Sequence, residues 1–468
     1  MRVLLINVSL RPESIEKLFP IGLGYVATAM KKAGYQFDLL DIDAHRFTDQ
    51  EVEDYFSTNI YDVYCLGCIV TGYKIIKSMV ALIRRINPQA TIIVGNSVAT
   101  SVHKILLTKT EVDIAVLGEG DEVVVEVLDH MLHSKPLNDI KGIAFTQNNQ
   151  IVETGYRCPI KNISDLPFID HSIFDVGIYL EASKVSVSDA VPFPREQARA
   201  MPVNTARGCV AKCGFCYHVF NNVPFRFRTE QSIVEEIKQL HDKYALNFVF
   251  FWDELTLFSK KRVKDICREL IDSKLNIYWT GTCRGDLLNK EEDLELIKLM
   301  KDAGCIGISY SLESADADIL KAMNKHMDVD QFSRQTELFH KGDMNVWTSL
   351  VLGYPQETPE TIKKTFDCCI KNGIYPSSGY LLPQPGSEVY EYALKNKYIT
   401  DEEDYLMRLG DRQDLRINLT SMSDDEFLDA VLDNLKRCNR ELNIGLDEEH
   451  LIKTQHRYRS TRDQSDEV

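Results

Sequence analysis

Short apolar runs rich in Val, Ile and Leu alternate with amphipathic helical patterns over residues 1–132. This alternation is typical of parallel βαβ units, in which a crossover helix follows each strand. The expected strands cover residues 2–7, 36–41, 63–68, 91–94 and 114–117. The pattern predicts a doubly wound, Rossmann-like parallel sheet, and such sheets bind ligands at the carboxyl ends of their strands.

A second series of strand-like runs follows a cysteine-containing loop near residue 210. These runs cover residues 248–252, 277–282, 307–311, 346–352 and 379–382, and helical patterns such as 232–244 separate them. They predict a second α/β domain of the barrel type, a partial TIM barrel. The pattern at residues 401–450 then predicts highly charged helices and no clear strands.

These patterns divide the chain into five expected parts within an α/β fold class. They are a doubly wound domain at 1–135, a connector with a small β element at 136–200, a barrel at 201–395, a helical region at 396–455 and a disordered tail at 456–468.

Composition narrows the class of protein. Hydrophobic residues make up 44% and charged residues 26% of the chain, as in soluble globular proteins. The net charge of -16 disfavours a nucleic-acid partner, because such proteins usually carry a basic stripe. The apolar N-terminus is too short for a signal peptide, and no stretch reaches 18 apolar residues, which predicts a cytoplasmic protein without a membrane span. Its 12 cysteines are then expected as thiols or metal ligands.

Three of these cysteines, Cys209, Cys213 and Cys216, form a CxxxCxxC motif within eight residues. Cys thiolates hold iron–sulfur clusters, and three ligands on a [4Fe-4S] cubane leave one iron open to chelate a small molecule. The alternatives are three incidental buried cysteines or a structural zinc site with His218 as fourth ligand. Zinc sites usually pair two knuckles, and no second knuckle lies nearby.

The loop resembles the signature of the radical S-adenosylmethionine (SAM) superfamily, with Phe215 as the aromatic residue before the last ligand. The resemblance implies that the reduced cluster cleaves SAM to a 5′-deoxyadenosyl radical, which abstracts hydrogen from an unactivated position. It also implies an electron donor such as flavodoxin or ferredoxin. On the same resemblance, residues that follow later strands are expected to bind SAM: Glu254 its ammonium, Arg284 its carboxylate, Glu313 its ribose, and Gly353 and Pro355 its adenine.

Together with the doubly wound domain, the motif is similar to radical SAM enzymes with an N-terminal cobalamin-binding domain. The positions that would line the corrinoid are Gly22, Leu23, Gly24, Thr71, Gly95, Gly118, Glu119 and Gly120. The DxHxxG motif that supplies a histidine to cobalt is absent, because Thr48 replaces its glycine. His45 is therefore expected to be a surface histidine. Asn96 and Ser97 replace a more usual glycine-rich sequence.

The resemblance implies methylation of an unactivated carbon in a small-molecule substrate, such as a natural-product or lipid precursor; it assigns no catalytic residue. Cyclisation, rearrangement or oxygenation without methyl transfer stay open, as does an iron–sulfur or corrinoid-binding regulatory protein. A methylthiotransferase would need three further ligands, and of Cys65, Cys68 and Cys158 the first two look like core residues. A polar cluster at 411–418, which includes Arg412, fits either a pocket for an anionic or sugar-like molecule or a solvated helix start.

Overall fold

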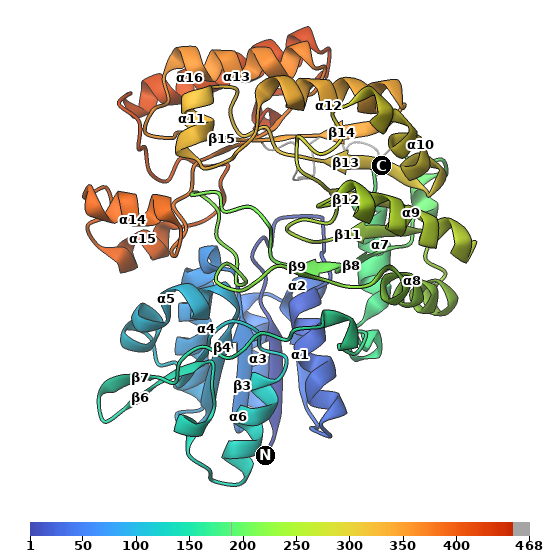
Figure 1. Ribbon diagram of the computed structural model, residues 1–468. Helices are drawn as coiled ribbons and strands as arrows, with labels where there is room; N and C mark the ends of the chain where they lie inside the picture. Colours follow the sequence, from blue (N-terminus) through green and yellow to red (C-terminus); the bar gives the residue numbers. More distant parts are fainter. Residues whose placement is uncertain (189, 453–468) are drawn as a thin grey trace, which may run out of the picture.

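The computed structural model describes residues 1–188 and 190–452. Figure 1 shows two α/β halves: the N-terminal sheet and its helices form the lower half, in blue and teal, and the second sheet with the C-terminal helices forms the upper half. The chain around strand β9 runs between the two halves.

The lower half contains a seven-stranded sheet in the order β2-β1-β3-β4-β5-β6-β7. Strands β1 to β5 are parallel, and β6 and β7 add to the edge as antiparallel strands. The strands are β1 (Val3–Asn7), β2 (Asp38–Asp41), β3 (Val63–Gly67), β4 (Thr91–Gly95), β5 (Ile114–Val116), β6 (Ile143–Gln147) and β7 (Gln150–Glu153). The helices are α1 (Ile21–Lys32), α2 (Ile42–His45), α3 (Asp49–Thr58), α4 (Tyr73–Ile86), α5 (Asn96–Lys109) and α6 (Val123–Leu132).

The apolar runs of this sheet are buried on both faces. In β1, Val3 and Leu5 pack into one hydrophobic cluster, while Leu4 and Ile6 pack into another. The first cluster includes side chains of α1 and α6, and the second includes side chains of α3, α4 and α5. Because successive strand side chains point to opposite faces, these near-continuous apolar runs require helices on both sides. The predicted doubly wound parallel sheet is confirmed.

The upper half contains a parallel five-stranded sheet in the order β14-β13-β12-β11-β8, and a separate parallel pair, β15 and β16. The strands are β8 (Ala200–Val203), β11 (Phe248–Phe251), β12 (Tyr278–Thr282), β13 (Cys305–Ser309), β14 (Asn345–Trp347), β15 (Ser349–Leu352) and β16 (Ser377–Tyr380); β9 (Ala206–Arg207) and β10 (Arg226–Phe227) form a short antiparallel pair. The helices are α7 (Val176–Ser186), α8 (Glu230–Tyr244), α9 (Lys260–Ser273), α10 (Leu294–Asp302), α11 (Ala317–Ala322), α12 (Val329–Lys341) and α13 (Pro359–Lys371).

The strand expected at 346–352 is two strands, separated at Thr348. The Thr348 side chain accepts a hydrogen bond from Leu312 N–H at 3.0 Å, and its carbonyl accepts one from Ser377 N–H at 2.9 Å. These bonds divert the chain from β13 toward β16. A bridge between Glu313 and Leu350 still links the two parts of the barrel.

The C-terminal region contains α14 (Glu388–Lys395), α15 (Glu402–Arg408) and α16 (Asp424–Glu441). Its described residues form no strand, as the charged helical pattern predicts. The tail expected at 456–468 lies outside the described residues. Strands β6 and β7 belong to the N-terminal sheet although they fall in the segment expected as a connector; the division into domains stays a prediction. Among the described residues, no helix is both long and apolar enough to span a membrane.

Candidate active site

The cysteine loop begins at a tightly bonded turn after β8. Asp253, at the end of β11, accepts hydrogen bonds from the backbone N–H groups of Thr205 and Ala206 at 2.7 and 3.0 Å. Gly208 then adopts φ +91°, a left-handed conformation that glycine takes without a steric penalty. Neighbouring β11 and β8 therefore fix where the loop starts.

The middle of the loop is held by its backbone. Gly214 N–H donates to Met323 O at 2.9 Å, and Gly214 O accepts from Val389 N–H at 3.1 Å. A Cβ atom at position 214 would lie 2.9 Å from a carboxylate oxygen of Glu388, so a side chain there would displace the Glu388 carboxylate. The loop thus lies between the end of α11 and the start of α14.

The three cysteines differ in exposure: Cys209 and Cys213 are half-buried and Cys216 is exposed. Burial in the surrounding protein still raises the pKa of the Cys216 thiol to about 12, and the neighbouring Cys213 and Cys209 add to the effect. Within the described part of the chain, no three His, Cys, Asp or Glu side chains converge on one point to hold a metal ion. A cubane is bound at separate iron atoms, so its thiolates do not need to converge in that way.

Charged side chains from three later strand ends surround these thiols. Burial raises the pKa of Cys213; Lys325 and Arg284 oppose this shift, and Glu313 reinforces it. Glu254 also acts on Cys216. The structure therefore brings three of the residues expected to bind SAM to the cysteine loop.

Glu254 follows β11 directly and accepts a hydrogen bond from Gly208 N–H at 3.3 Å. Its side chain reaches solvent on one side, and desolvation by the protein around it raises the pKa of its carboxyl to about 7. An ammonium group placed here would favour the ionised carboxylate.

Glu313 is 5% exposed and adopts φ +62°, a strained conformation for a residue with a side chain. Its carboxylate accepts a hydrogen bond from Lys325 Nζ at 2.9 Å. Arg284 bonds to Asp286 at 3.1 Å and to His326 O at 2.8 Å. Glu313 and Arg284, which are both expected to contact SAM, therefore already have protein partners.

Gly353 and Pro355 lie in the turn after β15, on the same side as the cysteine loop. Gly353 has φ +105°, and a Cβ atom there would lie 3.0 Å from the ring of Phe427. Tyr354 lies between these two residues in the sequence, and its hydroxyl would be 3.5 Å from a Cβ atom added at Gly214. Phe215 is half-buried and packs against the neighbouring core.

The carboxyl edge of the N-terminal sheet has a part that is open and apolar. A Cβ atom added at Gly22, Gly95 or Gly118 would meet no atom within 4 Å. Ile69, after β3, is 48% exposed, and Leu10 and Leu18 are 38% and 41% exposed. We call this set of exposed apolar side chains and uncovered glycines, which follow β1 and β3 or end β4, the open edge: Leu10, Leu18, Gly22, Ile69 and Gly95. An apolar macrocycle fits such a surface, because it would cover exposed apolar side chains and approach bare backbone.

Other positions expected to line a corrinoid have structural roles. A Cβ atom at Gly24 would lie 2.9 Å from Ile169, so this glycine serves packing. Leu23 packs against the core, and Thr71 lies half-buried in a 3-10 turn after β3. Gly120 approaches Val26. Their assignment to a cofactor stays a prediction.

Glu119 belongs to a buried set of charges that we call the ion network: Glu119, Asp121, Arg207 and Arg226. Arg207 pairs with Glu119 at 2.5 Å and with Asp121 at 2.9 Å, and Arg226 pairs with Glu119 at 2.9 Å. Their side chains are only 6% to 10% exposed. Glu119 and Asp121 follow β5, whereas Arg207 immediately precedes the cysteine loop. The network therefore joins the N-terminal sheet to that loop.

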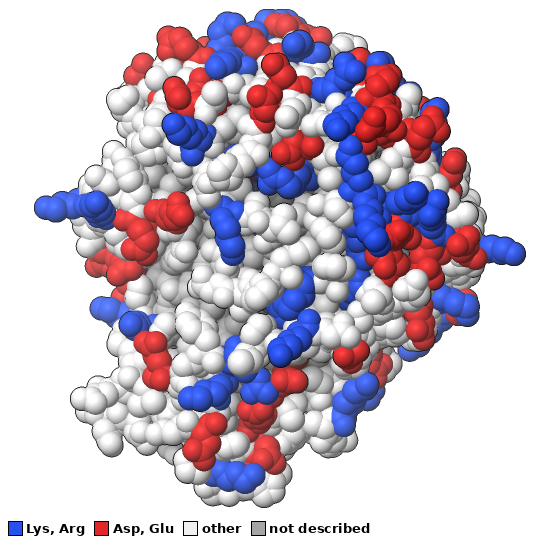
Figure 2. Space-filling view, viewed as in Figure 1, with Lys and Arg blue, Asp and Glu red and all other residues white. Residues whose placement is uncertain are grey.

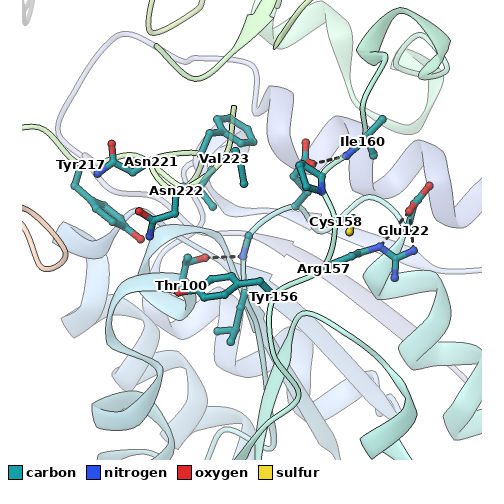
Figure 3. A pocket seen from close by; sticks show the side chains of 16 residues that line it. Thr100, Glu122, Tyr156, Arg157, Cys158, Ile160, Tyr217, Asn221, Asn222 and Val223 are labelled. Atoms are coloured by element: carbon teal, nitrogen blue, oxygen red, sulfur yellow. Dashed lines mark hydrogen bonds and ion pairs between the residues drawn. The ribbon is translucent and has the colours of Figure 1, made fainter. Parts of the chain in front are cut away.

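A cavity adjoins the ion network (Figure 3) and contains about 610 Å³ of space, part of it open to solvent. Tyr217 and Asn221, from the chain after Cys216, line one side, and Thr100 and Tyr156 line another. Gly118 and Glu119 also contribute. Figure 2 shows Lys and Arg side chains lying among Asp and Glu side chains over one face of the molecule.

The remaining candidates lie away from the loop or in the core. His45 is exposed and stacks on Phe47, as a surface histidine should. Cys65 and Cys68 are buried, and Cys158 is exposed. Asn96 adopts φ +68°, so asparagine takes the left-handed conformation for which glycine is more usual. Sequence reasoning missed Lys325. No local motif marks this lysine, because its partner Glu313 lies 12 residues earlier in the chain.

Two family models match separate parts of the chain. The Radical SAM superfamily model matches residues 203–369, and the B12 binding domain model matches residues 14–128. An uncharacterized methyltransferase of Pyrococcus horikoshii is 24% identical and is aligned over 81% of this chain and 79% of the relative. The anaerobic magnesium-protoporphyrin IX monomethyl ester cyclase of Rubrivivax gelatinosus is 26% identical over 89% of this chain and 73% of the relative. The cytidylyl-2-hydroxyethylphosphonate methyltransferase of Streptomyces wedmorensis is 23% identical over 95% and 90%.

Two solved structures share the fold. The radical SAM methyltransferase TsrM from Kitasatospora setae, with tryptophan and a SAM analogue bound, has a TM-score of 0.67 at 16% identity and covers 85% of this chain and 77% of its own. OxsB, with aqua-cobalamin and SAM bound, has a TM-score of 0.67 at 15% identity over 95% of this chain and 62% of its own.

Proposed function

We propose that this chain, in which residues 203–369 match the Radical SAM superfamily model and residues 14–128 match the B12 binding domain model, is a cobalamin-dependent methyltransferase of the radical SAM superfamily. Its substrate is a small molecule that is methylated at an unactivated carbon. One observation carries the proposal. The ion network attaches the cysteine loop to the sheet that bears the open edge, so a cluster and a corrinoid would serve one substrate space.

The residues of the barrel have distinct roles in this proposal. Cys209, Cys213 and Cys216 would hold the cluster through their thiolates. Glu254 and Glu313 orient SAM through its ammonium and its ribose, and Lys325 donates a hydrogen bond that holds the buried Glu313 carboxylate in place. When bound, the cluster supplies the electron that cleaves SAM, and the corrinoid supplies a transferable methyl group.

The open edge has the corresponding role in the N-terminal domain. Leu10, Leu18 and Ile69 would offer apolar contacts to a corrinoid, and Gly22 and Gly95 would leave their backbone open to it. His45 is exposed and lies on α2, after β2, so the proposal assigns it no contact with cobalt. A small redox protein of the flavodoxin or ferredoxin class would deliver electrons to the cluster.

A second candidate is radical cyclisation without methyl transfer. It is favoured by the similarity to the Rubrivivax gelatinosus enzyme, whose name describes a cyclase. The same cofactors serve both reactions, so the products must distinguish them. A methyltransferase adds one CH2 unit to its substrate, whereas a cyclase adds none.

The proposal is tested first by the metal content and the visible spectrum of the full chain, purified anaerobically from cells supplied with cobalamin. We expect iron and cobalt together, with absorption from both an iron–sulfur cluster and a corrinoid. Iron without cobalt, even after reconstitution with hydroxocobalamin, would overturn the cobalamin-dependent assignment. Cobalt without iron would overturn the radical assignment.

A further inference from the structure

Arg412 lies beside the last strand of the barrel, in the segment between α15 and α16. Its carbonyl accepts a hydrogen bond from Tyr380 N–H at 2.7 Å, so the backbone here continues the edge of β16. A Cβ atom at Gly379 would lie 2.9 Å from the Cγ and Cδ atoms of Arg412. Glycine at this strand position therefore makes room for the arginine side chain to lie across the sheet.

The face that Arg412 crosses is the inner face of the barrel. Leu350, Leu352 and Tyr380 point the other way, into the core, where Tyr380 packs edge-on against Phe427 of α16 at 5.5 Å. Because strand side chains alternate, Ser349 and Val351 of β15 and Ser377 and Gly379 of β16 face the interior. The inner surface of these two strands thus carries two serines, one valine and one glycine, and Arg412 brings a positive charge to it.

Within the described residues, the guanidinium group of Arg412 donates its hydrogen bonds to neutral acceptors. It donates to Leu350 O at 3.3 Å and to Ser377 Oγ at 2.9 Å. Burial lowers the pKa of Arg412, and Glu313 and Asp411 oppose the shift. A partly buried charge whose hydrogen-bond partners are neutral is costly unless a ligand compensates it. A carboxylate or phosphate matches the geometry of a guanidinium group, because it accepts two parallel hydrogen bonds.

The charges around Arg412 place it between the two predicted cofactor sites. Glu313, on the SAM side, acts on it from one direction. On the other, Asp411 pairs with Arg11 at 2.9 Å, and Arg11 follows β1 at the carboxyl edge of the N-terminal sheet. A substrate held at Arg412 would therefore lie between the cysteine loop and the open edge.

We propose that Arg412 binds an anionic group of the substrate, a carboxylate or a phosphate, inside the barrel. The inference rests on the proposed function, since it assigns the substrate class of the same site. Arg412 fixes one end of the molecule, and the carbon that reacts lies at a distance from that end, on the side of Glu313. Nearby Ser311 and Ser349, whose hydroxyls are 2.7 Å apart, offer additional hydrogen bonds to a polar substrate.

The test measures anion binding without turnover. Pyrophosphate and citrate, which represent the phosphate and carboxylate arms, are titrated by calorimetry into the full chain with its reconstituted cluster. We expect at least one of them to bind saturably and Arg412→Gln to weaken that binding about tenfold or more. Arg412→Lys should retain part of it, because it keeps the charge but not the paired donors.

Arg416→Gln is the matched control, because Arg416 is exposed and already pairs with Asp414 at 2.6 Å. It should bind both anions as the wild type does. The proposal is overturned if neither anion binds the wild type, or if Arg412→Gln binds them equally well while its unfolding midpoint is unchanged. Anion binding without any methyl transfer from SAM would instead contradict the proposed function and leave the anion site in place.

Discussion

The open edge and the ion network lie at the same carboxyl edge of one sheet, yet they are built in opposite ways. At the ends of β1 and β3, apolar side chains such as Ile69 are exposed to solvent and glycine backbone is uncovered. At the end of β5, Glu119 and Asp121 are buried against two arginines from the other half of the chain. The open edge exposes apolar side chains, which proteins usually bury. The ion network buries charged side chains, which proteins usually expose.

The difference separates binding from positioning. Exposed apolar surface has little value to a folded chain unless something covers it, so the open edge indicates a ligand. Buried ion pairs contribute little net stability, but removal of one partner is costly. The ion network therefore makes the position of the cysteine loop sensitive to the N-terminal domain. In the proposed function, the same edge would hold the corrinoid and set its distance from the radical chemistry.

The largest effect is expected outside both regions, at the cysteine loop that they serve. Cys213→Ala should abolish cluster binding, because two thiolates do not hold a cubane stably. Iron content should fall to background, and no 5′-deoxyadenosine should form from SAM under reducing conditions. Cys158→Ala, at an exposed cysteine outside the motif, should leave both unchanged. A Cys213→Ala protein that still cleaves SAM would contradict the cluster assignment.

The ion network is tested by Glu119→Gln, which leaves Arg226 without its carboxylate. We expect a loss of about 3–5 kcal/mol in the free energy of unfolding, measured in denaturant, as for other broken buried pairs. Glu122→Gln is the control three residues away, because the Glu122 side chain is 55% exposed and its partner Arg157 keeps a second carboxylate partner, Glu126. It should cost at most about 1 kcal/mol. Equal costs at both positions would remove the distinction between the network and ordinary surface pairs.

Glu357 is a buried carboxylate that, within the described residues, accepts hydrogen bonds from neutral donors, in contrast to the arginine-paired Glu119. Glu357 is 1% exposed and accepts hydrogen bonds from Gly353 N–H and Thr361 Oγ at 3.2 and 2.8 Å. Burial raises its pKa from 4.5 to about 7. The folded state then keeps a proton that the unfolded state has lost, so stability should fall as pH rises from 4.5 to 7, by about 3 kcal/mol. Glu357→Gln should flatten this part of the stability profile, and an unchanged slope in the variant would contradict the cause.

The smallest effect concerns the open edge. Ile69→Asp places a charge on the surface that the corrinoid would cover, and we expect about tenfold weaker cobalamin binding in a titration of visible absorbance. Ile60→Asp is a matched control, because Ile60 is 47% exposed against 48% for Ile69 but precedes β3 at the opposite edge of the sheet. Weaker binding in both variants, or in neither, would show that the open edge is not the corrinoid surface.

Local patterns in the sequence predict much of this fold. The apolar runs locate all five parallel strands of the N-terminal sheet to within two residues, because strands buried on both faces have continuous apolar sequences. The break at Thr348 could not be predicted, since its side chain bonds to Leu312, which is distant in sequence. Contacts of that kind leave no periodic signal.

The candidate site was predicted unevenly for a related reason. The cysteines share one short motif, whereas the partners of Glu119 lie 88 and 107 residues further along the chain. A glutamate in a glycine-rich strand end therefore resembles a ligand contact until Arg207 and Arg226 are placed beside it. Lys325 is similar, because only the fold brings it to Glu313.

The central claim is that SAM and a corrinoid exchange a methyl group on this chain. The most direct measurement is mass spectrometry of the corrinoid extracted after a reaction. In that reaction, the anaerobic protein with its cluster and cobalamin is incubated with a reductant and with SAM that bears a CD3 methyl group. We predict that the CD3 label appears in the corrinoid of the wild type. A corrinoid that stays bound but unlabelled, in protein that still cleaves SAM to 5′-deoxyadenosine, would contradict the assignment as a methyltransferase.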